Sequence, residues 1–444
     1  MVFVSVSLAC PTCRRELAAA GAALRCEPCG ATYPRVGRID CLVADPAAFL
    51  QIALSRFDLY RGVTQQRSQD LAEEARGAHL PPKARLRLQQ LAHGLLAEGR
   101  CLNELLEAVR NATREQPAPF ATLGVTLDDP LAAVEYAEHL FRDWVWGEAE
   151  NLQTLALLEQ YLTGPVSTLA VFGAGTARLA LDLSRNPRVG EVLAIDLNPL
   201  PFLVADRLLA GHGVDLWEFP LVPRSAEHVA VPRRLEPPTP VGSKLRLILA
   251  DALRAPLADQ ALDVVVTPWF IDAVPADMSE VAAAVNRVLR PGGLWLNIGP
   301  LCHQRAPAQA YSFEEICDLV RAGSFELYDQ QEHALKYFDS PVSATCRIDR
   351  TYVFAARKIG PPTPPLLPSS PVATWLQDPS RPIPMSAALA PSLQNAMMTA
   401  GIVSLVDGTR STVDLVAMLS QAWNVEPAAL VQPIQRVLLG IIGS

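Results

Sequence analysis

The sequence predicts an α/β fold with a doubly wound, mostly parallel sheet, and three observations support it. Residues 167–185, STLAVFGAGTARLALDLSR, combine an apolar strand, a glycine-containing turn and a helix. A second apolar strand, EVLAIDLNP, follows and reaches Asp196. Further apolar strands alternate with helical segments, which is typical of βαβ units. We expect this Rossmann-like domain to span residues 161–358.

Composition and charge limit the classes of partner. The chain has 444 residues, enough for about three domains, and half of its residues are apolar. Its formal net charge of −8 argues against nucleic acid, because phosphate binding needs clustered Lys and Arg. No apolar run approaches the ~20 residues of a membrane helix, and the start MVFVSVSLAC has no basic leader. Nine scattered cysteines fit a reducing compartment, so we expect a cytoplasmic protein without a membrane span.

Four of the cysteines form two CxxC pairs separated by twelve residues: Cys10, Cys13, Cys26 and Cys29. Four thiolates on two tight turns make the closed tetrahedral shell of a structural zinc, with no position open to a substrate. A segment this short has too little core to fold alone, whereas zinc binding contributes roughly 10–16 kcal/mol in small zinc domains. We therefore expect a zinc ribbon over residues 1–48. The alternative is four unrelated free thiols.

Residues 49–160 are expected to be helical. The stretch LRLQQLAHGLLAEGRCLNELLEAVR spaces Leu and Ala by three and four, as on an amphipathic helix, and we expect about three to five helices in the region. Within it, FRDWVWGEAENLQ places Arg142, Asp143, Trp144 and Trp146 close together. We take Arg142 and Trp144 as candidate cofactor-binding residues. The alternative for the two tryptophans is a core or a helix-packing seam.

The glycine turn and the acidic residue after the second strand predict a nucleotide-type ligand. Gly173 and Gly175 let a ligand approach the backbone closely, and Asp196, about 20 positions further on, can accept hydrogen bonds from ribose hydroxyls. The third glycine of a dinucleotide fingerprint is missing, and Ala177 or Arg178 stands in its region. This favours a ligand without a pyrophosphate, and we expect S-adenosylmethionine.

Three more strands complete the predicted sheet. The third, within KLRLILADAL, ends at Asp251 and Ala252, where an adenine is expected to bind. The fourth leads into VVVTPWFIDAVP, and the fifth follows a helix and a PGG turn. Ligands of open α/β sheets lie at the carboxyl ends of the strands. Asp196, Asp251, Asp272 and His303 all fall on or just beyond such ends.

Asp272 and His303 are the candidate catalytic residues. Displacement of a methyl group from a sulfonium requires a nucleophile with a free lone pair on the line of the bond that breaks. A carboxylate at the end of the fourth strand can accept an imidazole or amine N–H and leave the lone pair directed at the methyl group. Asp272 has this position, and the alternative is that it caps the turn before Pro275. His303 can bind substrate or shuttle a proton, or it is a solvated loop residue.

The strand pattern, together with LRPGG before the fifth strand, resembles the class I methyltransferases. A narrower resemblance, over about residues 135–358, is to the carnosine N-methyltransferase family. The motifs of that family occur here in the same order: RDW near residue 142, VVVTPWFIDAV, VLRPGGLWLNIGPL, YSFEEICDLVRAGSFEL and the closing YVFAARK. The front of the chain is similar to the short zinc ribbons that precede several bacterial methyltransferases.

The family resemblance implies a reaction and roles for two residues. It implies methyl transfer from S-adenosylmethionine to an imidazole nitrogen of a histidine-containing small molecule or peptide, with the Asp of FID and a His after GPL holding the imidazole. Asp272 matches the first of these residues. The family pattern GPLLYH reads GPLCHQ here, which puts His303 one position early. The family has Glu where this chain has Asp196, and of its tyrosine cluster before the last strand only Tyr352 remains.

Proline sets two segments apart from the core pattern. Residues 218–242, between the second and third strands, are expected to form a lid or a substrate wall. Residues 359–384 read as an extended linker. Residues 385–444 are expected to form a small helical or winged-helix domain, in which Thr409 and Ser411 precede an apolar helix. The stretch LVDGTRSTVDLVAML resembles PqqD-type peptide-recognition domains, which implies a peptide partner; a packing module or a homodimer contact is the alternative.

The sequence thus predicts an N-methyltransferase that acts on an imidazole or related nitrogen of a small molecule or peptide. One alternative is a binding or scaffold protein whose methyltransferase fold has lost catalysis. Another is an RNA methyltransferase, against which the acidic balance and the lack of an Asn-Pro-Pro-Tyr type motif argue. Because the ribbon is far from the sheet in sequence, we expect Cys26→Ser to destabilise the ribbon and to spare binding of the methyl donor.

Overall fold

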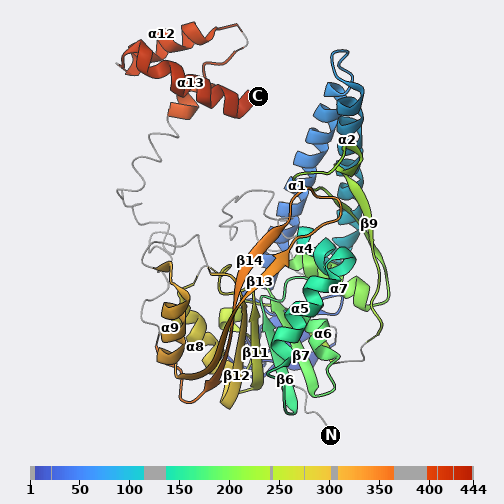
Figure 1. The fold of residues 1–444 in the computed structure, drawn as a ribbon, viewed down its shortest axis with the longest axis vertical. Helices are drawn as coiled ribbons and strands as arrows, with labels where there is room; N and C mark the ends of the chain where they lie inside the picture. Colours follow the sequence, from blue (N-terminus) through green and yellow to red (C-terminus); the bar gives the residue numbers. More distant parts are fainter. Residues whose placement is uncertain are drawn as a thin grey trace. The chain divides into compact units, whose positions relative to one another are not determined.

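The structure is a computed structural model, and it describes residues 6–21, 23–114, 137–240, 244–274, 276–301, 309–364, 398–407, 409–423 and 425–442 (Figure 1). The chain divides into two compact units, Met1–Ser369 and Ser370–Ser444. His303 and Pro275 lie outside the described residues, as does most of the predicted linker and the start of the predicted C-terminal domain. Each unit is described by itself.

A nine-stranded, mostly parallel sheet forms the centre of the first unit. From one edge to the other its strands are β13 (Phe325–Tyr337), β14 (Arg347–Lys358), β12 (Leu289–Gly299), β11 (Leu262–Pro268), β6 (Val166–Phe172), β7 (Val189–Asp196), β10 (Leu245–Leu249), β5 (Ile39–Cys41) and β4 (Arg35–Val36). The strands from β12 to β5 pair in parallel, whereas β13, β14 and β4 pair antiparallel with their neighbours. The order reverses between β6 and β11, and such a reversal is where ligands of doubly wound sheets bind.

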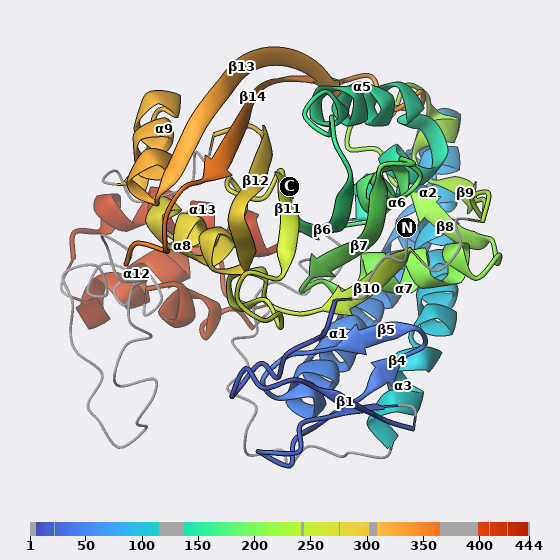
Figure 2. The same cartoon turned by 90° about the horizontal axis from the view of Figure 1, so that it is seen from below.

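Two cores lie on the two faces of this sheet. Along each strand alternate side chains enter alternate cores: Val264 and Val266 of β11 belong to one, and Val265 to the other. The first core is covered by α5 (Glu148–Glu159), α6 (Arg178–Ser184) and α7 (Pro199–Leu209). The second is covered by α8 (Met278–Val288) and α9 (Phe313–Ala322), which lie across the sheet from α5 and α6 in Figure 2. The central strands are buried on both faces, as a parallel sheet requires.

Local sequence signals set the ends of these helices. Asn198 and Asp277 each accept a backbone amide at the start of α7 and α8. Ser312 and Glu315 form a reciprocal capping box at the start of α9. Each of these side chains satisfies an amide that the first turn of a helix leaves without a partner.

The N-terminal ribbon is joined to the main sheet. Its three-stranded sheet consists of β1 (Ala18–Ala20), β2 (Ala23–Arg25) and β3 (Thr32–Tyr33), and its buried residues belong to the core under α8 and α9. The chain then continues through β4 and β5, and β5 pairs in parallel with β10. The predicted boundary at residue 48 therefore does not separate two independent sheets. Strands of two and three residues carry too little periodicity to be recognised in the sequence.

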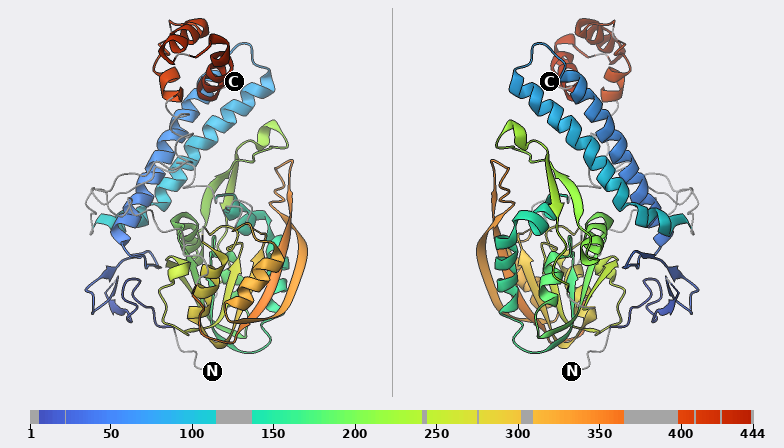
Figure 3. Two further views of the ribbon diagram at one scale, coloured as in Figure 1. Left: turned by 90° about the vertical axis from the view of Figure 1, so that its left-hand side faces the viewer. Right: turned by 90° about the vertical axis from the view of Figure 1, so that its right-hand side faces the viewer.

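The predicted helical region contains two long helices, α1 (Pro46–Glu74) and α2 (Pro82–Leu105), which lie side by side (Figure 3). After α3 (Glu107–Arg114) and an undescribed segment come α4 (Ala137–Phe141) and a π-helical turn, Arg142–Trp146. The Pro-rich segment after α7 forms a two-stranded antiparallel hairpin of β8 (Val214–Glu218) and β9 (Val231–Leu235). Trp217 of β8 donates its amide to Glu98 of α2 over 2.7 Å.

The C-terminal unit is helical in the residues described there. Its helices α12 (Thr412–Trp423) and α13 (Pro427–Ile442) enclose a small core that includes Ile402, Leu419 and Ile434. The predicted apolar helix after Thr409 and Ser411 is confirmed, and within residues 398–407, 409–423 and 425–442 no strand of a winged helix is present. In the part of the chain that is described, no helix is long and apolar enough to cross a membrane.

Candidate active site and metal centre

A cavity of about 1200 Å³ lies at the carboxyl ends of β6 and β11, where the strand order reverses. Four of the predicted site residues line it: Arg142, Gly173, Gly175 and Asp272. Four others do not line it, namely Trp144, Asp196, Asp251 and Ala252, and His303 lies outside the described residues. The cavity therefore joins the glycine turn to the FID segment.

The glycine turn after β6 is held by β7 and packs against the FID segment. The amides of Gly173 and Ala174 both donate to the carbonyl of Ile195, over 3.0 and 3.1 Å. Gly173 has a φ of +69°, and a Cβ built there would lie 2.6 Å from the ring of Phe270. Gly175 has a φ of +53°, and no atom lies within 4 Å of its Cβ position. The first glycine makes room for protein, and the second leaves open space beside the cavity.

Asp196 sits at the end of β7 beside the glycine turn. Its carboxylate accepts the amide of Gly175 over 2.7 Å and that of Asn198 over 2.8 Å. Burial raises the pKa of Asp196, while the two amides act in the opposite direction. Asp251, at the end of β10, accepts the amide of Leu253 over 2.9 Å and caps the 3₁₀ turn η5 (Ala252–Arg254). Both carboxylates thus shape turns at the strand ends, and their contacts with a ligand remain predictions.

The RDW motif braces the glycine turn. Asp143 pairs with Arg142 over 2.7 Å and accepts the hydroxyl of Thr176. Trp144 donates its indole N–H to the carbonyl of Thr176 over 3.3 Å, and Arg178 donates to the carbonyl of Asp143 over 2.6 Å. Trp144 therefore supports the turn from outside the cavity, whereas Arg142 reaches the cavity wall. The motif is at once a packing seam and part of the site.

The opposite wall of the cavity is aromatic. Trp269, which directly follows β11, stacks on Tyr337 of β13 with ring centroids 5.2 Å apart. The guanidinium of Arg142 lies 4.4 Å from the centroid of Tyr337, and that of Arg347 lies 4.7 Å from it. Phe338 lines the cavity beside them. Sequence reasoning missed Trp269, Tyr337, Phe338 and Arg347, and the only available signal was a Tyr-Phe pair at the end of a long strand.

Burial sets the charge states on this wall. Burial, followed by the charges of Arg142 and Arg347, lowers the pKa of His139 to about 3, so its imidazole is neutral at neutral pH. Burial raises the pKa of Tyr337, which keeps its phenol protonated. Burial alone would lower the pKa of Arg142, but the carboxylate of Asp143 outweighs it and keeps the guanidinium charged. The wall thus combines a neutral histidine, a protonated tyrosine and a charged arginine that is paired with a carboxylate.

The insertion between β8 and β9 supports the tip of the β13–β14 hairpin. Backbone hydrogen bonds join Arg224 to Val342 over 3.0 Å and Ala344 to Val222 over 2.7 Å. Glu218 of β8, which is 4% exposed, accepts the hydroxyl of Ser340 over 2.5 Å. No residue of 218–240 lines the cavity. The expected lid or substrate wall is therefore a buttress behind the wall that carries Tyr337 and Phe338.

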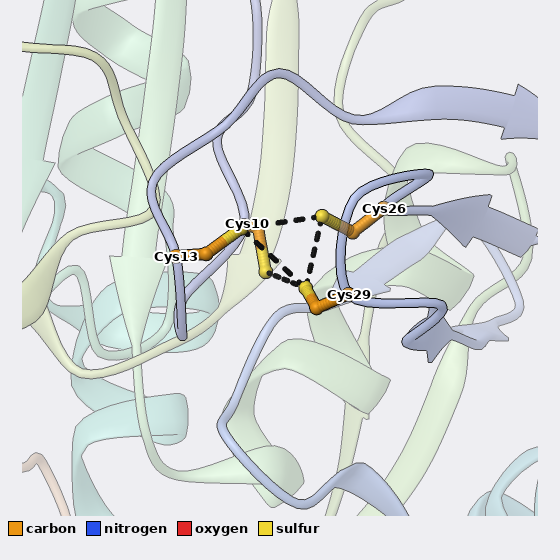
Figure 4. A group of neighbouring side chains, drawn as sticks. All are labelled: Cys10, Cys13, Cys26 and Cys29. Carbon is orange, nitrogen blue, oxygen red and sulfur yellow. Dashed lines mark hydrogen bonds between the residues drawn. The ribbon is translucent and has the colours of Figure 1, made fainter.

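The predicted cysteine cluster is assembled on the ribbon. The sulfur atoms of Cys10, Cys13, Cys26 and Cys29 all lie within 4.8 Å of one another, and the closest contacts are 3.0–3.5 Å (Figure 4). Sulfurs about 2.3 Å from a tetrahedral zinc lie about 3.8 Å apart, so this set fits such an ion after a small expansion. The hydroxyl of Tyr33 lies 3.1 Å from the Cys10 sulfur. The Tyr33 hydroxyl can therefore donate a hydrogen bond to the Cys10 thiolate.

The strand order defines the class of protein to which this fold belongs. A parallel sheet in the order β10-β7-β6-β11-β12, completed by an antiparallel β14 inserted between β12 and β13, is the fold of the class I methyltransferases. The predicted fold is thereby confirmed.

Comparison with known proteins gives a family resemblance for part of the chain. Residues 233–358 match the family model described as carnosine N-methyltransferase. A carnosine N-methyltransferase of Dictyostelium discoideum is 26% identical over 84 residues, which are 18% of this chain and 18% of that protein. The chain thus matches less than a fifth of the length of this curated relative. The resemblance predicted from the FID and LWLNIGPL motifs is confirmed over these residues.

Solved structures of methyltransferases are also similar. One is a putative sarcosine dimethylglycine methyltransferase from Galdieria sulphuraria, with 13% identity, a TM-score of 0.34 and coverage of 51% of this chain and 98% of that chain. Another is a 1,6-didemethyltoxoflavin N1-methyltransferase from Burkholderia thailandensis, with 19% identity, a TM-score of 0.33 and coverage of 55% and 93%. A third is a SAM-dependent methyltransferase from Methanosarcina mazei, with 17% identity, a TM-score of 0.32 and coverage of 46% and 97%.

Proposed function

We propose that this protein is an S-adenosylmethionine-dependent N-methyltransferase whose acceptor is an imidazole or related nitrogen of a small molecule or peptide. The observation that carries the proposal is that one continuous cavity joins the glycine turn after β6 to Asp272 after β11. The match of residues 233–358 to the carnosine N-methyltransferase family supports the type of acceptor atom.

The residues around the glycine turn fit the methyl donor. Open space beside Gly175 admits a ligand against the backbone, and Asp196 and Asp251 stand at neighbouring strand ends, where ribose and adenine would extend. When bound, S-adenosylmethionine supplies an electrophilic methyl group on a sulfonium. Arg142 would contact the bound donor from the cavity wall. Trp144 would affect donor binding indirectly, by bracing the glycine turn through Thr176.

Asp272 would orient the acceptor nitrogen. By accepting the N–H of an imidazole it would direct the lone pair of the other ring nitrogen toward the donor methyl. By accepting an N–H of an amine it would direct the lone pair of that same nitrogen. The new N–C bond forms as the S–C bond breaks, the bonding pair stays on sulfur, and the acceptor proton passes to Asp272 or to water. Positioning of this kind supplies about 7–11 kcal/mol of a displacement barrier. His303, if it takes the role implied by the family, would hold the same ring.

The test of this role is Asp272→Asn. The amide is nearly isosteric, so the fold and the affinity for S-adenosylhomocysteine should be unchanged, while turnover should fall by ~10²–10⁴. Acceptors are screened with labelled S-adenosylmethionine, and the products are identified by mass spectrometry. Asp318→Asn, in an exposed carboxylate of α9 paired with Arg321, is the control. If Asp272 only caps a turn, turnover will stay within a few-fold of wild type, because Asn caps nearly as well as Asp.

The donor site is tested separately by Asp196→Ala. Loss of the proposed ribose acceptor should weaken donor binding by about 1.5–3 kcal/mol, measured by calorimetric titration. An unchanged dissociation constant would contradict the assignment of Asp196. If wild-type protein does not bind S-adenosylmethionine at millimolar concentration, the binding or scaffold alternative is favoured instead.

We also propose that Cys10, Cys13, Cys26 and Cys29 hold one structural zinc ion. The convergence of the four sulfurs supports this, and zinc would replace the weak contacts among them. Metal analysis of freshly purified protein should find one zinc per chain, and Cys26→Ser should lose it. Cys346→Ser, in an exposed thiol outside the cluster, should retain it. Purified protein without zinc would contradict the proposal.

Three broader expectations stand as proposals beside these. We propose a bacterial, cytoplasmic enzyme. Among the described residues, the cysteines outside the cluster, Cys41, Cys101, Cys317 and Cys346, are free thiols, as expected in a reducing compartment. We propose that the C-terminal domain binds a peptide or a second copy of the chain. Nucleic acid is not expected as a substrate, because the net charge is −8.

A further inference from the structure

The ribbon contacts the loop in which the adenine end of the methyl donor is expected. Leu8 pairs with Leu257 in an isolated antiparallel bridge, and the amide of Ala9 donates to the carbonyl of Pro256 over 2.8 Å. Leu8, Ala9 and Leu257 are 5%, 3% and 0% exposed. This junction between segments about 250 positions apart is therefore buried and hydrogen-bonded.

The loop, residues 251–257, is also supported by its own turn and by α8. Asp251 lies two residues after the end of β10 and caps the short 3₁₀ turn by accepting the amide of Leu253. From α8, Arg287 donates to the carbonyls of Ala255 and Leu257 over 2.8 and 2.9 Å. The conformation of the loop is thus set by its own cap, by hydrogen bonds and core packing with α8, and by the ribbon.

The cysteine cluster lies between two attachments of the ribbon to this region. Cys10 directly follows Ala9, and its amide closes the first knuckle by donating to the carbonyl of Arg15 over 2.7 Å. After the second knuckle the chain returns through β5, where Cys41 pairs with Leu249 of β10. The cluster is therefore connected by backbone pairing, on its two sides, to the end of β10 and to the loop that follows it.

We propose that the ribbon is a positioning element of the donor site, in which Leu8 and Ala9 fix the loop 251–257 when a metal holds the four cysteines together. The inference rests on the proposed function, because it takes this loop as part of the donor site and the cysteines as zinc ligands. By linkage, zinc tightens donor binding and the donor tightens zinc by the same factor. The expectation from sequence distance, that Cys26→Ser spares donor binding, is replaced by its opposite.

A matched pair of variants tests the contact without removing the metal. Leu8→Ala truncates a buried side chain that belongs to the same apolar core as Ala255 and Leu257 of the loop. Leu24→Ala is the control, because Leu24 is 7% exposed and pairs with Tyr33 inside the ribbon. Full-length protein with one zinc per chain is titrated with S-adenosylhomocysteine in a calorimeter. Leu8→Ala should raise the dissociation constant by roughly 5–150-fold, the usual range of coupling between sites, and Leu24→Ala should not.

Two further readouts separate positioning from general destabilisation. The KM for S-adenosylmethionine should rise in Leu8→Ala while the KM for the acceptor is unchanged, and Leu8→Met should restore the donor affinity. In wild type, S-adenosylhomocysteine should slow the release of zinc to a chromogenic chelator. Equal donor affinity in wild type and Leu8→Ala, or equal loss in both leucine variants, would overturn the inference. If the zinc-loaded wild type does not bind S-adenosylhomocysteine, the proposed function fails instead.

Discussion

Replacing Gly173 by alanine should destabilise the fold more than the same change at Gly175, and the structure gives the size of the difference. Both residues have positive φ, at +69° and +53°, so both variants lose about 1–2 kcal/mol to left-handed backbone strain. At Gly173 the new Cβ also meets the ring of Phe270 at 2.6 Å. Phe270 is 8% exposed and packs edge-on against Phe172, so it cannot move freely. Overpacking of this kind adds about 1–3 kcal/mol.

The assay is urea unfolding of the two variants, followed by tryptophan fluorescence. Gly173→Ala should lose about 2–5 kcal/mol of unfolding free energy and Gly175→Ala about 1–2 kcal/mol. The effect on ligand binding should be larger at Gly175 than at Gly173, because the Cβ at Gly175 enters space that no protein atom occupies within 4 Å. Gly175→Ala should therefore weaken the binding of S-adenosylhomocysteine more than its small loss of unfolding free energy implies. Equal destabilisation, or unchanged donor affinity in Gly175→Ala, would refute the reasoning.

Three other changes test the supports of the cavity. Burial raises the pKa of Glu98 from 4.5 to about 7, so the folded state keeps a proton that the unfolded chain releases, and the free energy of unfolding falls as pH rises between these values. Glu98→Gln should remove this loss, of about 3 kcal/mol in total, in urea unfolding measured across that pH range. Glu218→Gln should loosen the tip of the β13–β14 hairpin, which Glu218 holds through Ser340. The KM for the acceptor should then rise several-fold while donor affinity is unchanged. Glu227→Gln, at an exposed residue of the same insertion, should change neither the hairpin tip nor the acceptor KM. Asp143→Asn should weaken donor binding in a calorimeter, because Asp143 ties Arg142 to Thr176, and unchanged affinity would count against the brace.

The regular parts of the fold could be predicted because they are periodic or carry strong local signals. The strands around Gly173 and Asp196 are apolar runs bounded by turn residues, and the spacing of the two CxxC pairs predicts the cluster of four sulfurs that the structure shows. The ends of β7 and the start of the helix after Ser411 follow from single residues, Asp196 and Ser411. Each of these signals lies within a few positions of the feature that it predicts.

The rest depends on contacts between distant segments. Tyr337 and Phe338 enter the cavity because the β13–β14 hairpin curves over it, and nothing near them in sequence marks that path. The sequence predicts that Trp144 binds the cofactor; in the structure its indole N–H donates to the carbonyl of Thr176 and it does not line the cavity, so its contact with a ligand stays a prediction. Asp251 and Ala252 stand at a strand end as predicted, yet the cavity does not extend to them. A strand end can be read from sequence, whereas the reach of a cavity is set by tertiary packing.

Both ends of the proposed site are supported from outside the α/β core. Loops and hairpin tips that extend beyond the sheet need partners elsewhere for their backbone groups. At the donor end the partner is the ribbon, through Ala9 and Pro256, and at the acceptor end it is the insertion, through Glu218 and Ser340. The two supports use different segments and share no contact among those described. Changes at Leu8 and Glu218 should therefore act independently, and a double variant should show additive losses in donor and acceptor affinity.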